Sequence, residues 1–213
     1  MWKLYYEWMM RISKGQPVFW GGTEAYTDAR KRELLSEEMN KRFDGYTSFE
    51  SIKQTYDNYK EKSWDNSAIN WMGYCDLNHR LPELLLMRVD KMSMWNSLEC
   101  RVPFFDHKVV ELALSIPERM KCANNENKHI LKEAVKGIIP DEIIYRRKQG
   151  FGAPVLDWFK GDMGKDMRSS ILRFVEETSL FNVDYIRKHI QEEPEWNDWY
   201  LYNLALWWET FIK

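Results

Sequence analysis

Apolar residues recur at intervals of three and four positions along most of this chain, which is the period of an amphipathic α-helix. The first such stripe predicts a helix over Trp2–Ser13, which Gly15 and Pro17 then end. Further helices are expected to begin after Thr27 and Ser48, because threonine and serine are among the residues that cap helix N-termini.

The middle of the chain continues this helical pattern. The same period predicts a helix over 66–79 and another over 82–95, with Pro82 at its first position. Because residues 82–95 are apolar on nearly all sides, we expect them to form a buried central helix. A break is expected at Pro103, since the residue before a proline avoids helical backbone, and Asp106 is expected to cap the next helix.

The remainder predicts a helix over 128–136 closed by Gly137, a short helix from Pro140, a loop over 149–154 and three or four helices from Val155 onward. No alternating strand pattern of useful length occurs. The prediction is therefore an all-α fold, built as one compact multi-helix domain.

Composition narrows the class of protein. The 213 residues are 44% hydrophobic and 30% charged, which is ordinary for a globular protein. No apolar run reaches the roughly 18 residues of a membrane-spanning helix, so no membrane association is expected. Basic and acidic residues are mixed along the chain and give a formal charge of −2, so no nucleic-acid partner is expected. Glu7 and Arg11 stand where a signal peptide needs an uninterrupted apolar stretch.

The cysteines bear on the cellular compartment. Cys75, Cys100 and Cys122 are odd in number, widely spaced and without histidines at metal-ligand spacing. We therefore expect small buried side chains, no zinc site and a reducing cytoplasmic location.

A cluster of charged residues in and after the expected central helix is the first candidate for chemistry. Its members are Arg88, Asp90, Lys91, Glu99, Arg101 and Asp106. Charges on an apolar helix must be paired or solvated. One interpretation is an internal ion-pair network in which Glu99 or Asp106 neutralises Arg101. The other is a cleft in which Arg88 or Lys91 meets an anionic ligand.

A basic run, Arg146-Arg147-Lys148, is the second candidate, because it passes directly into a glycine-flanked loop. Cations at a helix C-terminus interact favourably with the helix dipole, and a flexible lysine can also deliver a point charge to a phosphate. Spacing does not separate these two roles. The aromatic and glycine turn over 19–24 is interpreted as packing, and no nucleophile triad or carboxylate pair is apparent.

Three stretches together carry a resemblance to a known family. They are Leu-Pro-Glu-Leu-Leu-Leu-Met-Arg-Val-Asp-Lys-Met-Ser-Met-Trp-Asn-Ser-Leu-Glu-Cys-Arg-Val-Pro-Phe-Phe-Asp-His over 81–107, Lys-His-Ile-Leu-Lys over 128–132, and Pro-Asp-Glu-Ile-Ile-Tyr-Arg-Arg-Lys-Gln-Gly-Phe-Gly-Ala-Pro over 140–154, followed by Trp158-Phe159. In order and spacing they closely resemble the synthetase domain of glutamine-hydrolysing asparagine synthetases.

The resemblance implies an ATP-dependent ligase of asparagine biosynthesis. Such an amidotransferase activates the aspartate side chain with ATP and Mg, releases pyrophosphate, and lets ammonia from glutamine attack the adenylate. Lys148 matches the family lysine that approaches the ATP phosphates and the departing pyrophosphate. Arg88 and Asp90 are assigned to the same ATP and pyrophosphate cleft. Glu99, Arg101 and Asp106 match positions expected to form a structural ion-pair network.

The chain also departs from the family pattern. It has no Ser-Gly-Gly-x-Asp-Ser pyrophosphate loop, no Gly-Asp-Gly-x-Asp-Glu stretch and no glutaminase domain. Residues 1–213 are therefore expected to be the helical C-terminal part of an α/β adenine-nucleotide (PP-loop) synthetase domain. The sheet and the Mg ligands would lie in the upstream part of the same chain, and these residues alone would not make asparagine.

Two alternatives stay open. One is a relative that amidates another carboxylate, for example in cell-surface polysaccharide synthesis, because a fold does not determine its substrate. The other is a non-catalytic helical interaction module that docks through its aromatic C-terminus. The oligomeric state is also open, with a homo-oligomer among the possibilities.

Overall fold

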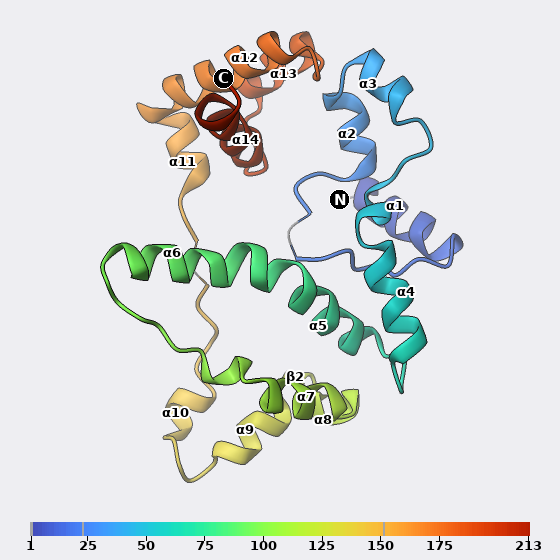
Figure 1. Cartoon of the computed structure of the whole chain (residues 1–213), viewed down its shortest axis with the longest axis vertical. Coiled ribbons are helices and arrows are strands. Elements are labelled where there is room, and N and C mark those ends of the chain that lie inside the picture. The colour runs from blue at the N-terminus through green and yellow to red at the C-terminus, as the bar shows by residue number, and fades with distance from the viewer. Residues whose placement is uncertain (1, 23, 151) are drawn as a thin grey trace. The chain divides into compact units, whose positions relative to one another are not determined.

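The computed structural model describes residues 2–22, 24–150 and 152–213 (Figure 1). The helical class is confirmed: within those ranges the regular structure is helical apart from the two-residue strands β1 (Cys122–Ala123) and β2 (Glu126–Asn127). The helices form two compact units, where the sequence pattern predicted one. Unit 1 comprises the described residues of 1–18, 24–48 and 151–213, and unit 2 those of 19–23 and 49–150. None of the described helices is both long and apolar enough to cross a membrane.

Unit 1 contains seven α-helices among its described residues. They are α1 (Trp2–Ser13), α2 (Asp28–Leu34), α3 (Glu37–Arg42), α11 (Val155–Lys160), α12 (Met163–Thr178), α13 (Val183–Glu192) and α14 (Asp198–Phe211). The expected bounds of the first helix are confirmed, as are the cap at Thr27, whose Oγ1 accepts from the Arg30 backbone N–H, and the run of helices after Val155.

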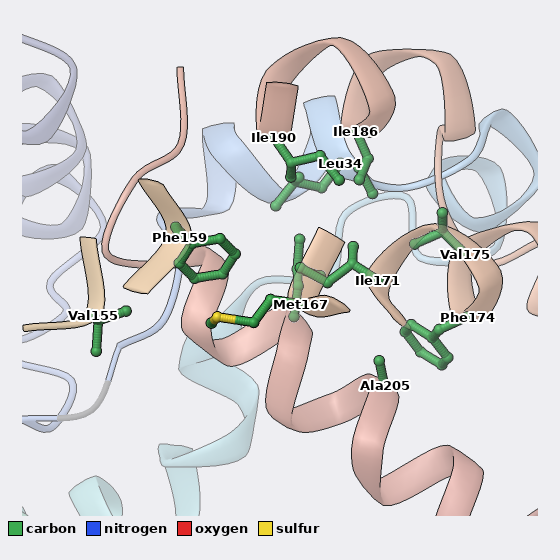
Figure 2. Close-up of a cluster of buried hydrophobic side chains, with 11 residues drawn as sticks. Leu34, Val155, Phe159, Met167, Ile171, Phe174, Val175, Ile186, Ile190 and Ala205 are labelled. Atoms are coloured by element: carbon green, nitrogen blue, oxygen red, sulfur yellow. The ribbon is translucent and has the colours of Figure 1, made fainter. Parts of the chain in front are cut away.

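The core of unit 1 is centred on α12, which packs against α11, α13 and α14. Met167, Ile171, Phe174 and Val175 recur at helical spacing and are at most 2% exposed. Figure 2 shows them facing Phe159 of α11, Ala205 of α14, the two isoleucines of α13 and Leu34 of α2. The end of α2 is also joined to the α12–α13 connection, because the Asn182 N–H donates to Leu34 O at 2.8 Å.

Unit 2 contains shorter elements. They are α4 (Lys53–Lys62), α5 (Ala68–Asn78), a π-helical turn η2 (Leu81–Leu86), α6 (Met87–Trp95), a 3₁₀ turn η3 (Pro103–Phe105), α7 (His107–Ser115), α8 (Glu118–Lys121), the β1–β2 hairpin, α9 (His129–Val135) and α10 (Asp141–Ile144). A further 3₁₀ turn, η1 (Ser48–Ser51), lies at the boundary between the units. The expected cap of α7 by Asp106 is confirmed, since Oδ1 accepts from the Lys108 N–H at 2.9 Å.

The core of unit 2 is mainly aromatic. Its buried members are Trp20, Phe49, Ile52, Tyr59, Trp71 and Cys75. Trp71 is central: its ring lies 4.9 Å from that of Tyr56, and its Nε1 donates to Phe19 O at 2.8 Å. The interpretation of the 19–24 turn as packing is confirmed for Trp20, which is 7% exposed, while Thr23 lies outside the described residues.

Two local predictions were wrong. Ser48 does not cap α4, because the chain forms η1 over Ser48–Ser51 and α4 begins only at Lys53, with Ile52 as its N-cap. The Ser48 Oγ accepts from Lys31 Nζ. The cysteines also do not behave alike: Cys75 is buried, Cys122 is half-buried and Cys100 is exposed.

The prediction of a buried central helix was also wrong for this chain. No residue of α6 is buried, and Met92 and Trp95 are 71% and 89% exposed. The principal neighbour of α6 within unit 2 is η2, its own continuation, so the described part of unit 2 supplies no layer that covers its apolar sides. An apolar pattern records that a helix is suited to burial, but not whether its partner is present.

Candidate functional site

The candidate site lies in unit 2 and begins with the irregular start of α6. In η2 the Met87 N–H donates to Pro82 O, five residues earlier, instead of to the residue four back. Such π turns insert one residue into a helix, rotate the next turns about the helix axis, and occur frequently at functional sites. Pro82 in the first turn fits this geometry, since proline has no N–H to satisfy there.

The charged residues of α6 come directly after this turn. Arg88 and Lys91 are three residues apart and so share one face of the helix, with Asp90 beside them. All three side chains are exposed. Within the described residues none of them forms an ion pair or a side-chain hydrogen bond, so these charges are available to a ligand or to another part of the protein.

The corner after α6 holds the expected ion pair only in part. Ser97 adopts the left-handed conformation at φ 55°, and the Leu98 N–H donates back to Ser93 O at 2.9 Å, which ends the helix. Beyond it Arg101 Nη2 lies 2.6 Å from Glu99 Oε1. Asp106 caps α7 instead of joining this pair, and both paired side chains are largely exposed, at 84% for Arg101 and 68% for Glu99.

Lys148 lies in the irregular segment beyond α10. That helix ends at Ile144, with Tyr145 as its C-cap. The basic run therefore lies past the last helical turn, and its side chains are exposed. Lys148 has no hydrogen bond or ion pair with any described residue. A Cβ placed on Gly150 would meet nothing within 4 Å, so no described side chain crowds the backbone two residues after Lys148.

The start of this segment is nevertheless held in place. Lys132 Nζ lies 5.3 Å from the centre of the Tyr145 ring, and it is 2.7 Å from Glu126 Oε1. Glu126 also accepts from His129, and these hydrogen bonds from Lys132 and His129 lower the pKa of its carboxyl group. Tyr145 therefore contacts a lysine that is itself paired, whereas Lys148, three residues later, has no hydrogen bond or ion pair with any described residue.

Among the described residues, the structure thus joins Glu99 to Arg101 but joins neither Arg88 nor Asp90 to Lys148 by a hydrogen bond or ion pair. An exposed ammonium that follows two arginines in the chain has the charge and the hydrogen-bond donors that phosphate oxygens accept from. The described residues hold no group of three or more His, Cys, Asp or Glu side chains that could bind a metal ion.

A buried polar cluster in unit 1 was not predicted from the sequence. His189 Nε2 lies 3.0 and 3.1 Å from the two carboxylate oxygens of Asp198, which is 0% exposed and also accepts the Glu195 N–H at 2.7 Å. Arg30 Nη2 lies 3.1 Å from His189 Nδ1, and Arg30 Nη1 pairs with Glu33 at 2.9 Å.

The cluster has consequences for its surroundings. Burial first, and then the charge of Asp198, raises the pKa of Tyr26, whose hydroxyl donates to Asn197 O at 2.7 Å. The only signal in the sequence was that His189 shares the apolar face of α13 with Ile186 and Ile190. Because the cluster joins α2, α13 and the start of α14, we expect its polar groups to stabilise unit 1.

The aromatic C-terminal helix is divided between core and surface. Trp199, Tyr202 and Trp208 pack against the core of unit 1. Trp207 and Phe211 remain 49% and 73% exposed, with ring centres 6.5 Å apart. One side of the helix therefore packs internally, while Leu204, Leu206, Trp207 and Phe211 leave the other side exposed.

Comparison with known proteins identifies the class and then the family. The chain is a mostly helical protein with a basic segment suited to phosphate, and the family model for asparagine synthase matches residues 5–209. The chain is 31% identical over 177 residues to the glutamine-hydrolysing asparagine synthetase 1 of Bacillus subtilis (strain 168). The aligned region covers 83% of this chain and 27% of that protein. The chain belongs to the asparagine synthase family.

Two further relatives match shorter regions. Asparagine synthetase 3 of Bacillus subtilis (strain 168) is 52% identical over 67 residues, which is 32% of this chain and 11% of that protein. The human glutamine-hydrolysing asparagine synthetase is 35% identical over 82 residues, covering 35% and 15% respectively. The chain therefore spans about a quarter or less of these relatives' lengths. No solved structure matches it significantly.

Proposed function

We propose that this chain is the helical C-terminal part of a glutamine-hydrolysing asparagine synthetase. The complete enzyme would activate aspartate with MgATP as an aspartyl-adenylate and amidate it in the cytoplasm with ammonia from glutamine. The observation that carries the proposal is Lys148, an exposed lysine without a partner among the described residues, at the position that matches the family's phosphate-binding lysine.

Lys148 would bind the β- and γ-phosphates of ATP and then the departing pyrophosphate. As the bond between the α- and β-phosphates breaks, negative charge accumulates on the leaving group, and a nearby ammonium lowers the energy of that state. Arg88 and Asp90 would line the same cleft. Mg would neutralise phosphate charge when bound, with ligands supplied from the upstream part of the protein.

The exposed apolar side chains of α6 support the proposal that unit 2 is incomplete without another part of the protein. The accessible surface of the chain is 15765 Å². The apolar side chains of α6 contribute to this surface, since Met92 is 71% and Trp95 is 89% exposed. We assign the exposed sides of α6 to contact with the upstream sheet that would carry the pyrophosphate loop, so the chain by itself would be inactive.

The test is Lys148→Ala in the complete enzyme. A charge-assisted hydrogen bond contributes about 1.5–3 kcal/mol, so pyrophosphate release should slow by roughly tenfold to a hundredfold, while glutamine hydrolysis continues. Lys60→Ala removes another exposed lysine that has no partner among the described residues, and should leave both rates unchanged. Unchanged ATP turnover in the Lys148 variant would contradict the assignment. Aspartate and uronic acids should be compared as acceptors, with turnover expected only for aspartate.

A further inference from the structure

Unit 2 contains an open, mostly apolar groove that the proposed reaction does not use. Its volume is about 710 Å³, within the range of small-molecule sites. It is lined by α5, η3, α7, the end of α8, the β1–β2 hairpin and α9, all within unit 2. Ile69, Leu77, Phe104, Leu114 and Leu131 are typical of its walls.

A glycine on the groove wall keeps this space open. Gly73 lies within α5 on the same face as Ile69, Asn70 and Leu77. A glycine inside a helix destabilises it relative to alanine, and is usually explained by a positive φ or by a close backbone contact. Neither applies here, because Gly73 has no positive φ and a Cβ at this position would meet nothing within 4 Å. Its missing side chain leaves volume in the groove.

The charged groups on the lining are two lysines. Lys121 and Lys128 line the groove, and no aspartate or glutamate is among its described lining residues. Lys121 Nζ donates to Oδ1 of Asn70. The Asn70 residue is 4% exposed, and its Nδ2 donates to Asp65 Oδ2 at 2.7 Å. Burial lowers the pKa of Lys121, against the opposing influence of Asp65 and Cys122.

The second lysine is held by an unusual backbone. Lys128 is the N-cap of α9 in the left-handed conformation, at φ 61°, which is uncommon for a residue with a side chain. Its ammonium has no hydrogen bond or ion pair with any described residue. The lining therefore combines an apolar wall with an unneutralised cation at Lys128 and a partly desolvated one at Lys121.

We propose that this groove binds a small amphipathic anion, a molecule with a hydrocarbon body and a single carboxylate head, independently of the adenylation chemistry. The body would occupy the space beside Gly73 and along the walls of α5, α7 and α9. The head would lie at the lysine side of the lining, where a carboxylate accepts hydrogen bonds from Lys121 and Lys128.

The test is calorimetric titration of the native full-length protein with decanoate, below the concentration at which decanoate aggregates, and with uncharged decanol in parallel. Saturable one-to-one binding of decanoate is expected. Lys121→Met should weaken it about tenfold or more and leave decanol binding unchanged, since only the carboxylate uses the cation. Lys60→Met removes an exposed lysine that does not line the groove, and should bind both probes as the parent does.

Gly73→Leu and Lys128→Met keep the proposal testable if Lys121→Met fails to fold. Gly73→Leu should abolish binding of both probes, because it fills the groove, and Lys128→Met should weaken decanoate alone. Two results would overturn the proposal. One is the absence of saturable decanoate binding, as would occur if another part of the protein fills the groove. The other is equal binding of decanoate and decanol that neither lysine substitution changes.

Discussion

The helices α12 and α6 show how similar apolar content leads to different outcomes. α12 buries six residues, including Met167 and Phe174, because three neighbouring helices cover its apolar stripe. α6 buries none, although methionines, valine and tryptophan occur on several of its sides. A stripe on one face can be covered within a single unit, whereas apolar sides all round require a second layer. The difference indicates that unit 1 is complete around α12 and that unit 2 is open around α6.

The largest expected effect tests this difference with one residue type on both helices. Met167→Ala in α12, where the side chain is 0% exposed, should lower the free energy of unfolding by about 2–5 kcal/mol, because it leaves a cavity. Met92→Ala in α6, where the side chain is 71% exposed, should change it by less than about 0.5 kcal/mol. Urea unfolding of the 213-residue chain measures both.

The same pair also tests the proposed layer over α6. In the complete enzyme, Met92→Ala should become clearly destabilising, because the side chain would then be buried. An equally small effect in both chains would contradict that part of the proposal.

The polar cluster of unit 1 gives the next effect. His189→Ala removes the partner of Asp198, a buried carboxylate, and should lower the free energy of unfolding by about 1.5–3 kcal/mol. His107→Ala, at an exposed position in α7, is the matched control and should have almost no effect. Equal melting temperatures for the two variants would show that the cluster does not stabilise unit 1.

A smaller effect is expected at the corner after α6. Arg101→Met breaks the pair with Glu99, but both side chains are largely exposed, and such pairs contribute about 0–1 kcal/mol. The stability of the 213-residue chain should therefore barely change. A loss of several degrees in melting temperature would instead support the structural network expected from the sequence.

The smallest effect concerns pH. Burial is the largest single influence on the pKa of Asp65 and raises it, but the hydrogen bonds from the Ser67 N–H, Asn70 and Ser63, together with the charge of Lys121, outweigh burial, so the folded pKa is lowered. A lowered folded pKa contributes stability above the unfolded value of about 3.9, and this is lost as pH falls through the folded pKa. Asp65→Asn should flatten the dependence of melting temperature on pH below about pH 4, and an unchanged slope would contradict this.

Much of the fold could be predicted because it depends on neighbours along the chain. The bounds of α1, the caps at Thr27 and Asp106 and the helices after Val155 follow from local spacing and hydrogen bonding. The π turn before α6 was not predicted, because its i to i−5 hydrogen bond leaves the apolar pattern almost unchanged. Ser48 was mispredicted because the apolar spacing after it is compatible with both a 3₁₀ turn and an α-helix, and the chain forms the turn η1 before α4 begins at Lys53.

The candidate site divides in the same way. The residue types and order around Arg88, Asp90 and Lys148 could be found from the sequence, because they form contiguous motifs. The exposure of α6 and the assembly of Arg30, His189 and Asp198 could not, because these depend on residues far apart in the chain.

The sequence by itself determined the helical class, the positions of most helices and the family, since spacing and motifs are local properties. The tertiary structure decided the division into two units, the separation of Asp106 from Arg101, the polar cluster in unit 1 and the groove beside Gly73. Burial and charge pairing depend on which distant segments pack against each other. Each apolar pattern along the chain is compatible with more than one such packing arrangement.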